Sequence, residues 1–305
     1  MKKILLVRSN KAYLPQIDAS IDYFNEKKLG FQLYDSAEIS DIVLSEFDCL
    51  WEFMGFGISK KRDIPSIHEY ASLSTGSFPQ LKNKAKRILN FKPDLRIYLN
   101  KFVREGLGFN DEIDFVYRDM GIDDVFFEYK DSPKNYDCVY IGSITEGRGI
   151  PYLLDYFKWN CKNRSLLIIG EVPDEIYTNY SSCHNITFTG NLPYKEVPKY
   201  ASQAVYGINY MPNKYPYNIQ TSTKLLEYLA MGLEVITTEY LWIHHFMKEN
   251  HMSLITVDEK LEGLESEIIN HERNRSGKKM NNVEKFKWKH VIEQSGLEEK
   301  LLNIL

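Results

Sequence analysis

Short apolar runs rich in β-branched and aromatic residues alternate along this chain with segments whose apolar residues recur at the helical period. That alternation is typical of parallel β-sheets whose strands are joined by crossover helices, so the pattern indicates an α/β protein. Strands are predicted at 3–7, 31–35, 48–53, 96–100, 114–118, 138–142, 166–170, 185–190, 206–211, 233–237 and 253–257. Helices are predicted at 15–28, 79–90, 150–161, 193–203, 222–231, 239–249 and 259–271, with a long helical stretch at 285–305.

A polar stretch without clear periodicity, residues 127–137 with Pro133 inside it, separates the strands into two series. We predict a linker there, because domain boundaries fall in polar segments that contain proline. The expected domains are 1–130 and 135–285, each a Rossmann-like sheet with its own helices. Two such sheets that face each other leave a cleft, and ligand-binding groups are expected at the carboxyl ends of their strands.

The composition excludes some classes of function. The 305 residues include 38 Lys+Arg and 42 Asp+Glu, and the net charge of −4 gives no general basic field for nucleic acid. No apolar run approaches the roughly 18 residues of a membrane span, and the apolar run near the N-terminus is too short for a signal peptide. The four cysteines show no paired spacing and suit buried, reduced thiols. We therefore expect a cytoplasmic protein.

Residues 216–239 form the first candidate ligand site. Thr221, Ser222 and Thr223 are good N-cap residues, and a helix then runs until a glycine ends it. A free helix N-terminus offers backbone N–H groups and a partial positive charge to a diphosphate. Glu227, about one turn further along, is placed to accept hydrogen bonds from a ribose diol. The alternative is a capped amphipathic helix on which this glutamate is simply exposed.

Residues 139–150 form the second candidate site. A buried strand ends at Gly142, and a helix follows a short loop that contains Arg148 and Gly149. A glycine lets phosphates approach the backbone closely, and an arginine adds a bidentate cationic contact. The segment has no GxGxxG motif and no P-loop lysine, so a dinucleotide oxidoreductase and a kinase-like NTPase are not supported.

Together these segments resemble the nucleotide-sugar-binding domain of the GT-B-fold retaining glycosyltransferases of family 4. Further matches follow in order along the chain and extend the resemblance over residues 118–290. They are the segment that closes the family's first domain at 118–127, a strand ending in glycine at 166–170, a Phe-x-Gly strand and loop at 187–201, and a glutamate followed by A-x-G-x-x-V at 227–235.

The departures from the family pattern concern the donor site. The first of the family's two glutamates, eight positions before Glu227, would fall at Ile219. Ser143 stands where the family has a phosphate-binding arginine, and Arg148 stands at the position of the family's lysine. The glycine-rich loop that follows the family's first strand is replaced by residues 9–16.

Residues 220–228, QTSTKLLEY, narrow the resemblance to a subgroup of bacterial surface-polysaccharide transferases. The subgroup implies that hydroxyl groups near the helix start and the charge of Lys224 act in place of the missing glutamate and arginine. The product of the reaction would then be a polysaccharide or another glycoconjugate.

The resemblance implies a GT-B architecture, with two Rossmann-like domains facing across a cleft and the C-terminal helix 286–305 crossing back onto the first. It implies a glycosyltransferase of hexosyltransferase type that moves a sugar from a nucleotide-sugar donor to a hydroxyl acceptor with retention. UDP- and GDP-linked donors are expected, with no cofactor and no metal. Prepositioned cations and amides can stabilise the leaving diphosphate as an oxocarbenium-like sugar forms.

The same resemblance assigns roles to individual residues. Glu227 would hold the donor ribose, Leu192 would contact the base through its backbone, and Arg148 with the amides near 222–224 would hold the diphosphate. The complete set of expected donor-binding residues is Gly142, Ser143, Arg148, Gly170, Leu192, Thr221, Ser222, Thr223, Lys224 and Glu227.

The first half offers one candidate residue, His68, followed by a polar, small-residue loop that suits the wall of a cleft. The family often has a histidine of its first domain near the donor sugar. The predicted catalytic residues are therefore His68, Arg148 and Glu227, and the alternative for His68 is a purely structural role. Asp48 and Glu52, on or near a predicted strand, suit solvated or salt-bridged carboxylates better than an acceptor base.

Residues 78–92 place Leu81, Ala85, Ile88 and Leu89 on one face of a helix, with basic residues around them. A basic amphipathic helix can lie on an anionic membrane, which would bring the active site to a lipid-linked acceptor. The protein would then be cytoplasmic with peripheral contact at the inner face of the membrane. The alternative is a helix that covers a sheet and turns a solvated face outward.

Two other functions fit the same fold. A non-catalytic GT-B-like subunit would bind a nucleotide sugar or serve as a scaffold without turnover. A sugar-nucleotide epimerase of GT-B fold would need acid and base carboxylates that the sequence does not place. His244, His245 and His251 form a loose cluster with no further ligand pattern, so no metal site is predicted.

Overall fold

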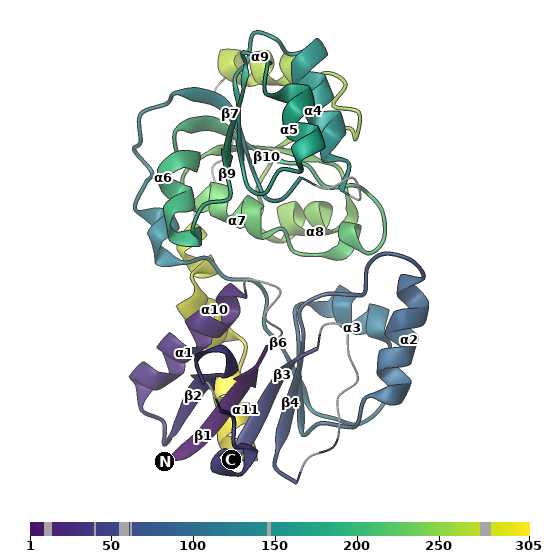
Figure 1. Cartoon of the computed structure of the whole chain (residues 1–305), viewed down its shortest axis with the longest axis vertical. Coiled ribbons are helices and arrows are strands. Elements are labelled where there is room, and N and C mark those ends of the chain that lie inside the picture. Colours follow the sequence, from purple (N-terminus) through teal and green to yellow (C-terminus); the bar gives the residue numbers. More distant parts are fainter. Residues whose placement is uncertain (9–13, 40, 55–60, 62, 145–147, 275–281) are drawn as a thin grey trace. The chain divides into compact units, whose positions relative to one another are not determined.

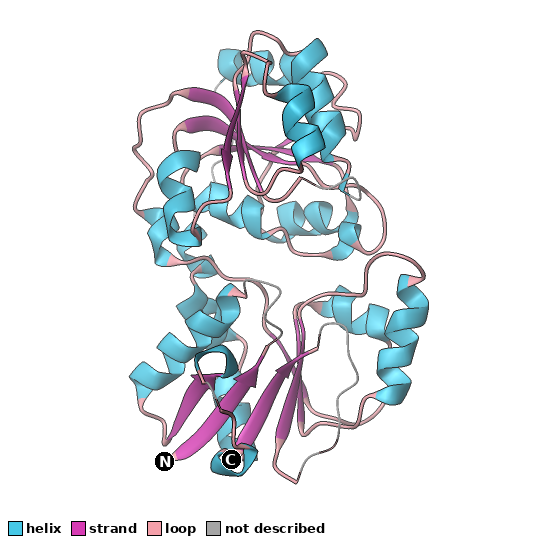
Figure 2. Ribbon diagram, viewed as in Figure 1, coloured by secondary structure: helices cyan, strands magenta, loops and turns pink. Residues whose placement is uncertain are grey.

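The computed structural model describes residues 1–8, 14–39, 41–54, 61, 63–144, 148–274 and 282–305. The chain divides into two compact units, and each contains one six-stranded sheet (Figure 1). The first unit comprises Met1–Asp123 and Lys285–Leu305, and the second comprises Asp124–Glu284. All strand pairs are parallel, so each sheet needs helices on both faces, and Figure 2 shows that layering.

The first unit has the strand order β2-β1-β3-β4-β5-β6. Its strands are β1 (Lys2–Val7), β2 (Phe31–Asp35), β3 (Cys49–Phe53), β4 (Ser66–Tyr70), β5 (Leu95–Tyr98) and β6 (Phe115–Tyr117). Its helices are α1 (Pro15–Lys27), α2 (Pro79–Leu89), α3 (Lys101–Leu107), α10 (Trp288–Gln294) and α11 (Leu297–Ile304). Helices α1, α10 and α11 bury apolar side chains against one face of the sheet, and α2 and α3 lie on its other side (Figure 1).

The second unit has the strand order β12-β11-β10-β7-β8-β9. Its strands are β7 (Tyr136–Ile141), β8 (Leu166–Ile169), β9 (Ile186–Gly190), β10 (Ala204–Asn209), β11 (Glu234–Thr238) and β12 (Ile255–Val257). Its helices are α4 (Ile150–Trp159), α5 (Asp174–Tyr180), α6 (Val197–Ala201), α7 (Thr223–Ala230), α8 (Leu241–Glu249) and α9 (Leu264–Asn274). Helices α4, α5 and α9 share one core with the sheet, and α6, α7 and α8 lie on its other side (Figure 1).

The C-terminal residues pack within the first unit. The N–H of Ile122 donates to the carbonyl of Phe286 at 2.8 Å. Gly121 makes room for this contact, because a Cβ atom there would lie 2.5 Å from the ring of Trp288. The tail predicted as one long helix is two helices, α10 and α11, because Gly296 between them has a φ angle of +70°.

Among the described residues, one strand and two α-helices are absent from the sequence-based prediction. Strand β4 lies in the middle of its sheet with all five residues buried, although Ser66, His68 and Glu69 are polar. This mixed composition hides the strand, because a central parallel strand is expected to be a nearly continuous apolar run. Helices α3 and α5 have seven residues each, which is too short to show a helical period.

Helix α2 turns its polar side chains inward. Asn83 and Lys86 are buried, and each forms a hydrogen bond with a backbone group of another segment. Leu81, Ile88 and Leu89 are instead 64%, 65% and 54% exposed. The outer face of α2 therefore carries these apolar side chains beside the exposed Lys84 and Arg87, which differs from the polar outer face expected for a helix that covers a sheet.

Two further features concern membrane-spanning helices and the cysteines. Within the described ranges, no helix is long and apolar enough to cross a bilayer. The four cysteines are free thiols, and Cys49, Cys138 and Cys161 are buried. Burial raises the pKa of Cys49 and Cys161 to about 12, so these thiols stay protonated and unreactive at neutral pH.

Candidate functional site

The carboxyl ends of β7 and β8 meet at two glycines. Gly142 follows β7 and Gly170 follows β8, with φ angles of +132° and +146°. A Cβ atom on Gly170 would lie 2.4 Å from the carbonyl oxygen of Gly142, so no other residue fits there. The N–H of Gly170 donates to the carbonyl of Gly190 at 3.0 Å, which brings in the end of β9. A ligand can therefore approach the backbone of three strand ends without meeting a side chain on these glycines.

Tyr228 anchors helix α7 against this part of the sheet. Its hydroxyl accepts a hydrogen bond from the N–H of Ile141 at 2.9 Å. Its ring lies against Gly207 inside β10, where a Cβ atom would be 2.3 Å from the ring. Any larger residue at position 207 would push the helix away from the sheet. Tyr228 thereby holds α7 against β10 and the carboxyl end of β7.

Ser222, the N-cap residue of α7, has its hydroxyl engaged elsewhere. Its side chain does not cap the helix but donates to Oδ1 of Asn209 at 2.7 Å. Asn209 is completely buried and donates to the hydroxyls of Thr237 at 2.9 Å and Tyr240 at 3.0 Å. This network fixes the start of α7. The predicted role of the Thr221, Ser222 and Thr223 hydroxyls at a ligand stays a prediction.

Lys224 is a buried cation at the start of α7. It is 9% exposed, and its Nζ donates to the hydroxyl of Tyr140 at 3.0 Å. The same Nζ lies 3.6 Å from the place that a Cβ atom of Gly142 would occupy. Burial lowers the pKa of Lys224, and the positive charge of nearby Arg148 lowers it further. The glycine edge is thus lined by one buried cation, with a second cation close to it.

Glu227 lies one turn further along the same helix. It is 4% exposed, and the hydroxyl of Tyr194 donates to its Oε1 at 2.9 Å. Tyr194 begins the 3-10 helix η5 (Tyr194–Glu196) that follows β9. Burial raises the pKa of Glu227 to about 7, although the Tyr194 hydrogen bond and the charge of Lys224 act in the opposite direction. Ionised and protonated forms of this carboxyl therefore coexist near neutral pH.

The second unit brings together most of the residues predicted for the donor. One edge of the sheet brings together Gly142, Gly170, Lys224 and Glu227. Arg148 is close enough to lower the pKa of Lys224. Ser143 is exposed beside Gly142. Leu192 is half-buried in the loop between Gly190 and Tyr194, and residues 9–13 of the replaced glycine-rich loop lie outside the described residues.

His68 belongs to the first unit and has no exposed surface. It lies in the middle of β4, with its Nε2 atom 3.4 Å from Oε2 of Glu52 on the neighbouring strand. Its ring meets the edge of Phe91 at a centroid distance of 4.9 Å. A catalytic role for His68 stays a prediction. Because its side chain is completely buried, it could affect a ligand only through Glu52 or after a rearrangement of β4.

Sequence reasoning missed the groups that hold the two charges. Tyr140 and Tyr194 supply the hydroxyls on Lys224 and Glu227, and Tyr228 anchors the helix that carries both. Gly207 was the available signal for Tyr228, because a glycine inside a strand marks a close approach by another group. In the described part of the chain, no three histidine, cysteine or carboxylate side chains converge as metal ligands do.

The second unit matches a known protein family. Residues 135–271 match the model of the group 1 glycosyl transferases. A search of curated proteins found no match.

Solved structures resemble the whole chain. Sucrose-phosphate synthase from Thermosynechococcus elongatus has a TM-score of 0.71 at 11% identity, over 99% of both chains. Anabaena HepE in complex with UDP-glucose has a TM-score of 0.64 at 12% identity, over 100% of this chain and 97% of that one. AviGT4, a glycosyltransferase involved in avilamycin A biosynthesis, has a TM-score of 0.64 at 11% identity, over 99% of this chain and 98% of that one. At these identities the likeness shows the fold, which is GT-B.

Proposed function

We propose that this chain is a glycosyltransferase that moves a sugar from a nucleotide-sugar donor to a hydroxyl acceptor with retention at the anomeric carbon, as the match of residues 135–271 to the group 1 glycosyl transferases supports. One observation carries the proposal. Lys224 and Glu227 are buried charged residues on one helix, and each is hydrogen-bonded to a tyrosine hydroxyl instead of to an opposite charge. Charged groups are costly to bury in this way, and a ligand that bonds to both would offset that cost.

The donor would bind along the edge formed by the strand ends. The carboxylate of Glu227 would accept hydrogen bonds from the ribose diol, in place of the one that Tyr194 now donates. The diphosphate would lie against the glycine surface near Gly142, where Lys224, Arg148 and the first N–H groups of α7 supply positive charge. The backbone near Leu192 would contact the base.

The transfer reaction requires that this site stabilise a leaving diphosphate. As the bond between the anomeric carbon and the diphosphate breaks, negative charge develops on the phosphate oxygens and an oxocarbenium-like sugar forms. Tyr140 holds Lys224 in place before the reaction begins, and Arg148 lies close enough to affect the pKa of Lys224, so the attraction of these cations needs little reorganisation. We propose that these cations act without a metal. The HepE structure holds UDP-glucose, which favours a UDP-linked donor here.

The acceptor would be a glycan or lipid-linked molecule at the inner face of the cytoplasmic membrane. Support comes from α2, whose outward face carries Leu81, Ile88 and Leu89 and whose exposed flank carries Lys84. Apolar side chains that insert between lipids, with basic groups at the headgroups, describe an interfacial helix. Phe78, just before the helix, is 76% exposed and extends the apolar face.

A thermal-shift screen with UDP-, GDP-, ADP- and dTDP-sugars tests the proposal. A donor at 100 times its dissociation constant stabilises the folded state by about 2.7 kcal/mol, which raises Tm by several degrees. The same screen in EDTA should give the same shift, and transfer to glycan acceptors should also persist in EDTA. Loss of transfer in EDTA would reject the metal-free mechanism, and binding without any transfer or hydrolysis would favour the non-catalytic subunit.

A further inference from the structure

A concave site lies at the amino ends of β11 and β12, at the edge of the sheet opposite to Gly142 and Gly170. It is a cleft of about 500 Å³, within the size range of small-molecule sites. We call it the amino-edge cleft. It is bordered by α9, by the turn between α7 and β11, and by the segment that precedes β12. None of the residues predicted for the donor lines it.

One wall of the amino-edge cleft is the polar face of α9. Glu267, Asn270, His271 and Asn274 line it, and their spacing of three, four and seven residues places them on one side of the helix. The buried residues of α9, which include Ile268, face the core instead. This helix therefore presents a carboxylate, two amides and an imidazole to one hollow.

The other walls are largely apolar. Leu233, Val235 and Met252 line the cleft and are buried in the unit. The stem of Lys130 passes over Gly232 at the rim, 3.9 Å from the position of a Cβ atom there. An apolar floor under hydrogen-bonding walls is the usual composition of a small-ligand site.

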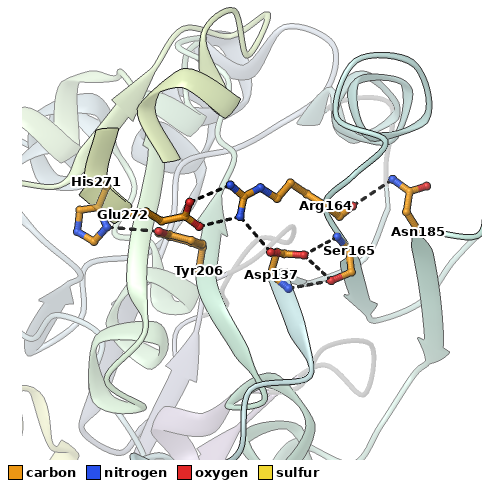
Figure 3. Close-up of polar contacts among 7 residues, drawn as sticks. All are labelled: Asp137, Arg164, Ser165, Asn185, Tyr206, His271 and Glu272. Carbon is orange, nitrogen blue, oxygen red and sulfur yellow. Dashed lines mark hydrogen bonds and ion pairs between the residues drawn. The ribbon is translucent and has the colours of Figure 1, made fainter. Parts of the chain in front are cut away.

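The wall formed by α9 is held in place by charges beside it, as Figure 3 shows. Arg164 forms two hydrogen bonds with Glu272 of α9, at 2.7 and 3.0 Å, and a third with Asp137 of β7 at 3.2 Å (Figure 3). His271 lies against the hydroxyl of Tyr206 at 3.4 Å (Figure 3). Because these contacts exist before any ligand arrives, the polar face of α9 needs little ordering to bind one.

The lining also indicates the class of ligand. The cleft is lined by Glu234, Glu267 and Lys130, so it has no excess positive charge to attract a phosphate. Carboxylates and amides accept and donate hydrogen bonds to hydroxyl groups, and apolar side chains pack against C–H groups. We propose that the amino-edge cleft binds a neutral saccharide at a site separate from that of the donor.

Saturation-transfer difference NMR on the full chain tests this proposal with N-acetylglucosamine, lactose and maltotriose as probes. Spectra are recorded with and without UDP, so that binding at the donor site is separated from binding in the cleft. We expect at least one saccharide to bind in the presence of UDP. Ser253→Trp, which places an indole in the cleft, should abolish the signal. Asn270→Leu should weaken it about tenfold, as loss of a hydrogen bond with a ligand predicts.

Glu262→Gln is the control for Glu267→Gln, because Glu262 is exposed near the start of the same helix and does not line the cleft. The control should bind saccharide as the wild type does, and Glu267→Gln should bind more weakly. Absence of binding by all three probes, or binding that Ser253→Trp leaves unchanged, would overturn the proposal. Displacement of a bound saccharide by inorganic phosphate would overturn the assigned ligand class. Failure of UDP to bind would count against the proposed donor site alone.

Discussion

Both units bury charged side chains, but they neutralise them in different ways. In the first unit Arg118 donates to Glu69, both side chains are 1% exposed, and Trp51 donates to the second carboxylate oxygen at 2.9 Å. In the second unit the buried Lys224 and Glu227 each have a tyrosine hydroxyl as hydrogen-bond partner. Among the described residues, neither of these two forms an ion pair.

The difference separates a structural role from a binding role. In the first unit each buried charge has the opposite charge as its hydrogen-bond partner, although Nε and Nη1 of Arg118 find no partner among the described residues. A phenol donates or accepts one hydrogen bond, so Lys224 and Glu227 each keep hydrogen-bonding capacity that the protein does not use. Lys224 and Glu227 therefore keep an electrostatic preference that a ligand with phosphates and hydroxyls can satisfy. Buried charge by itself does not mark a site, whereas buried charge whose hydrogen-bond partner is a neutral hydroxyl does.

The largest expected effect is on the stability of the first unit. Arg118→Met leaves the Glu69 carboxyl without its cation in the core, which should lower the free energy of unfolding by about 3–5 kcal/mol. Arg118→Met with Glu69→Leu should recover much of that loss, because no charge is then left alone. Lys224→Met should cost far less. Urea unfolding measures the free energy of unfolding of each variant. Equal decreases for Arg118→Met and Lys224→Met would show that the buried charges of the two units do not differ in their structural role.

The next effect is on the donor. Glu227→Ala and Arg148→Ala should each weaken donor binding and transfer by roughly 10- to 150-fold, which corresponds to the loss of one charged hydrogen bond at about 1.5–3 kcal/mol. Both variants should remain folded. Glu262→Ala and Arg273→Ala, exposed residues of the same unit, serve as matched controls and should keep wild-type activity. Wild-type rates in both site variants would show that the donor binds elsewhere.

Helix α2 gives a third test, confined to the first unit. Lys82, Lys86 and Arg87 already bond to backbone carbonyls, so Lys84 and Lys92 are the better residues to change. Lys84→Gln with Lys92→Gln should weaken binding to anionic vesicles about 30-fold, at about 1 kcal/mol for each charge. Leu81→Ser with Ile88→Ser should weaken it at high salt as well, because insertion of apolar groups is not screened.

The donor-binding site should be unaffected by these changes in α2. Co-sedimentation measures binding to the vesicles, and a UDP thermal shift in the same samples measures binding at the donor site. Wild-type protein that stays in solution with anionic vesicles at low salt would refute membrane contact through α2.

The smallest effect is a pH dependence of donor binding. The pKa of Glu227 is about 7 in the unliganded protein, and ribose hydroxyls would donate to its ionised form. Binding then requires loss of a proton below pH 7, so UDP affinity should rise about tenfold from pH 6 to pH 8 and level off above. Isothermal titration calorimetry measures this. In Glu227→Gln the UDP affinity should change with pH only as far as UDP itself titrates. The same pH dependence of affinity in that variant as in the wild type would show that Glu227 does not bind the ribose.

The sequence alone determined the parallel sheets, most of the helices and the positions of Gly142, Gly170 and Glu227. These features are local: apolar runs set strands, a 3.6-residue period sets helices, and a glycine after a strand signals close backbone approach. The break at Gly296 was equally local, because a glycine can adopt a positive φ angle that ends one helix before the next begins. It was missed because helical periodicity continues on both sides of it.

Only the tertiary structure decided what each charge faces. Strand β4 is a strand because its neighbours β3 and β5 pair with it and the polar Glu69 meets Arg118 from a distant segment. The tyrosines on Lys224 and Glu227 come from β7 and from the loop after β9, which are separated from α7 by 84 and 33 residues. The outward apolar face of α2 likewise depends on partners for Asn83 and Lys86 in other segments. A local pattern records which residues are polar, but burial energies depend on contacts between segments that the pattern does not contain.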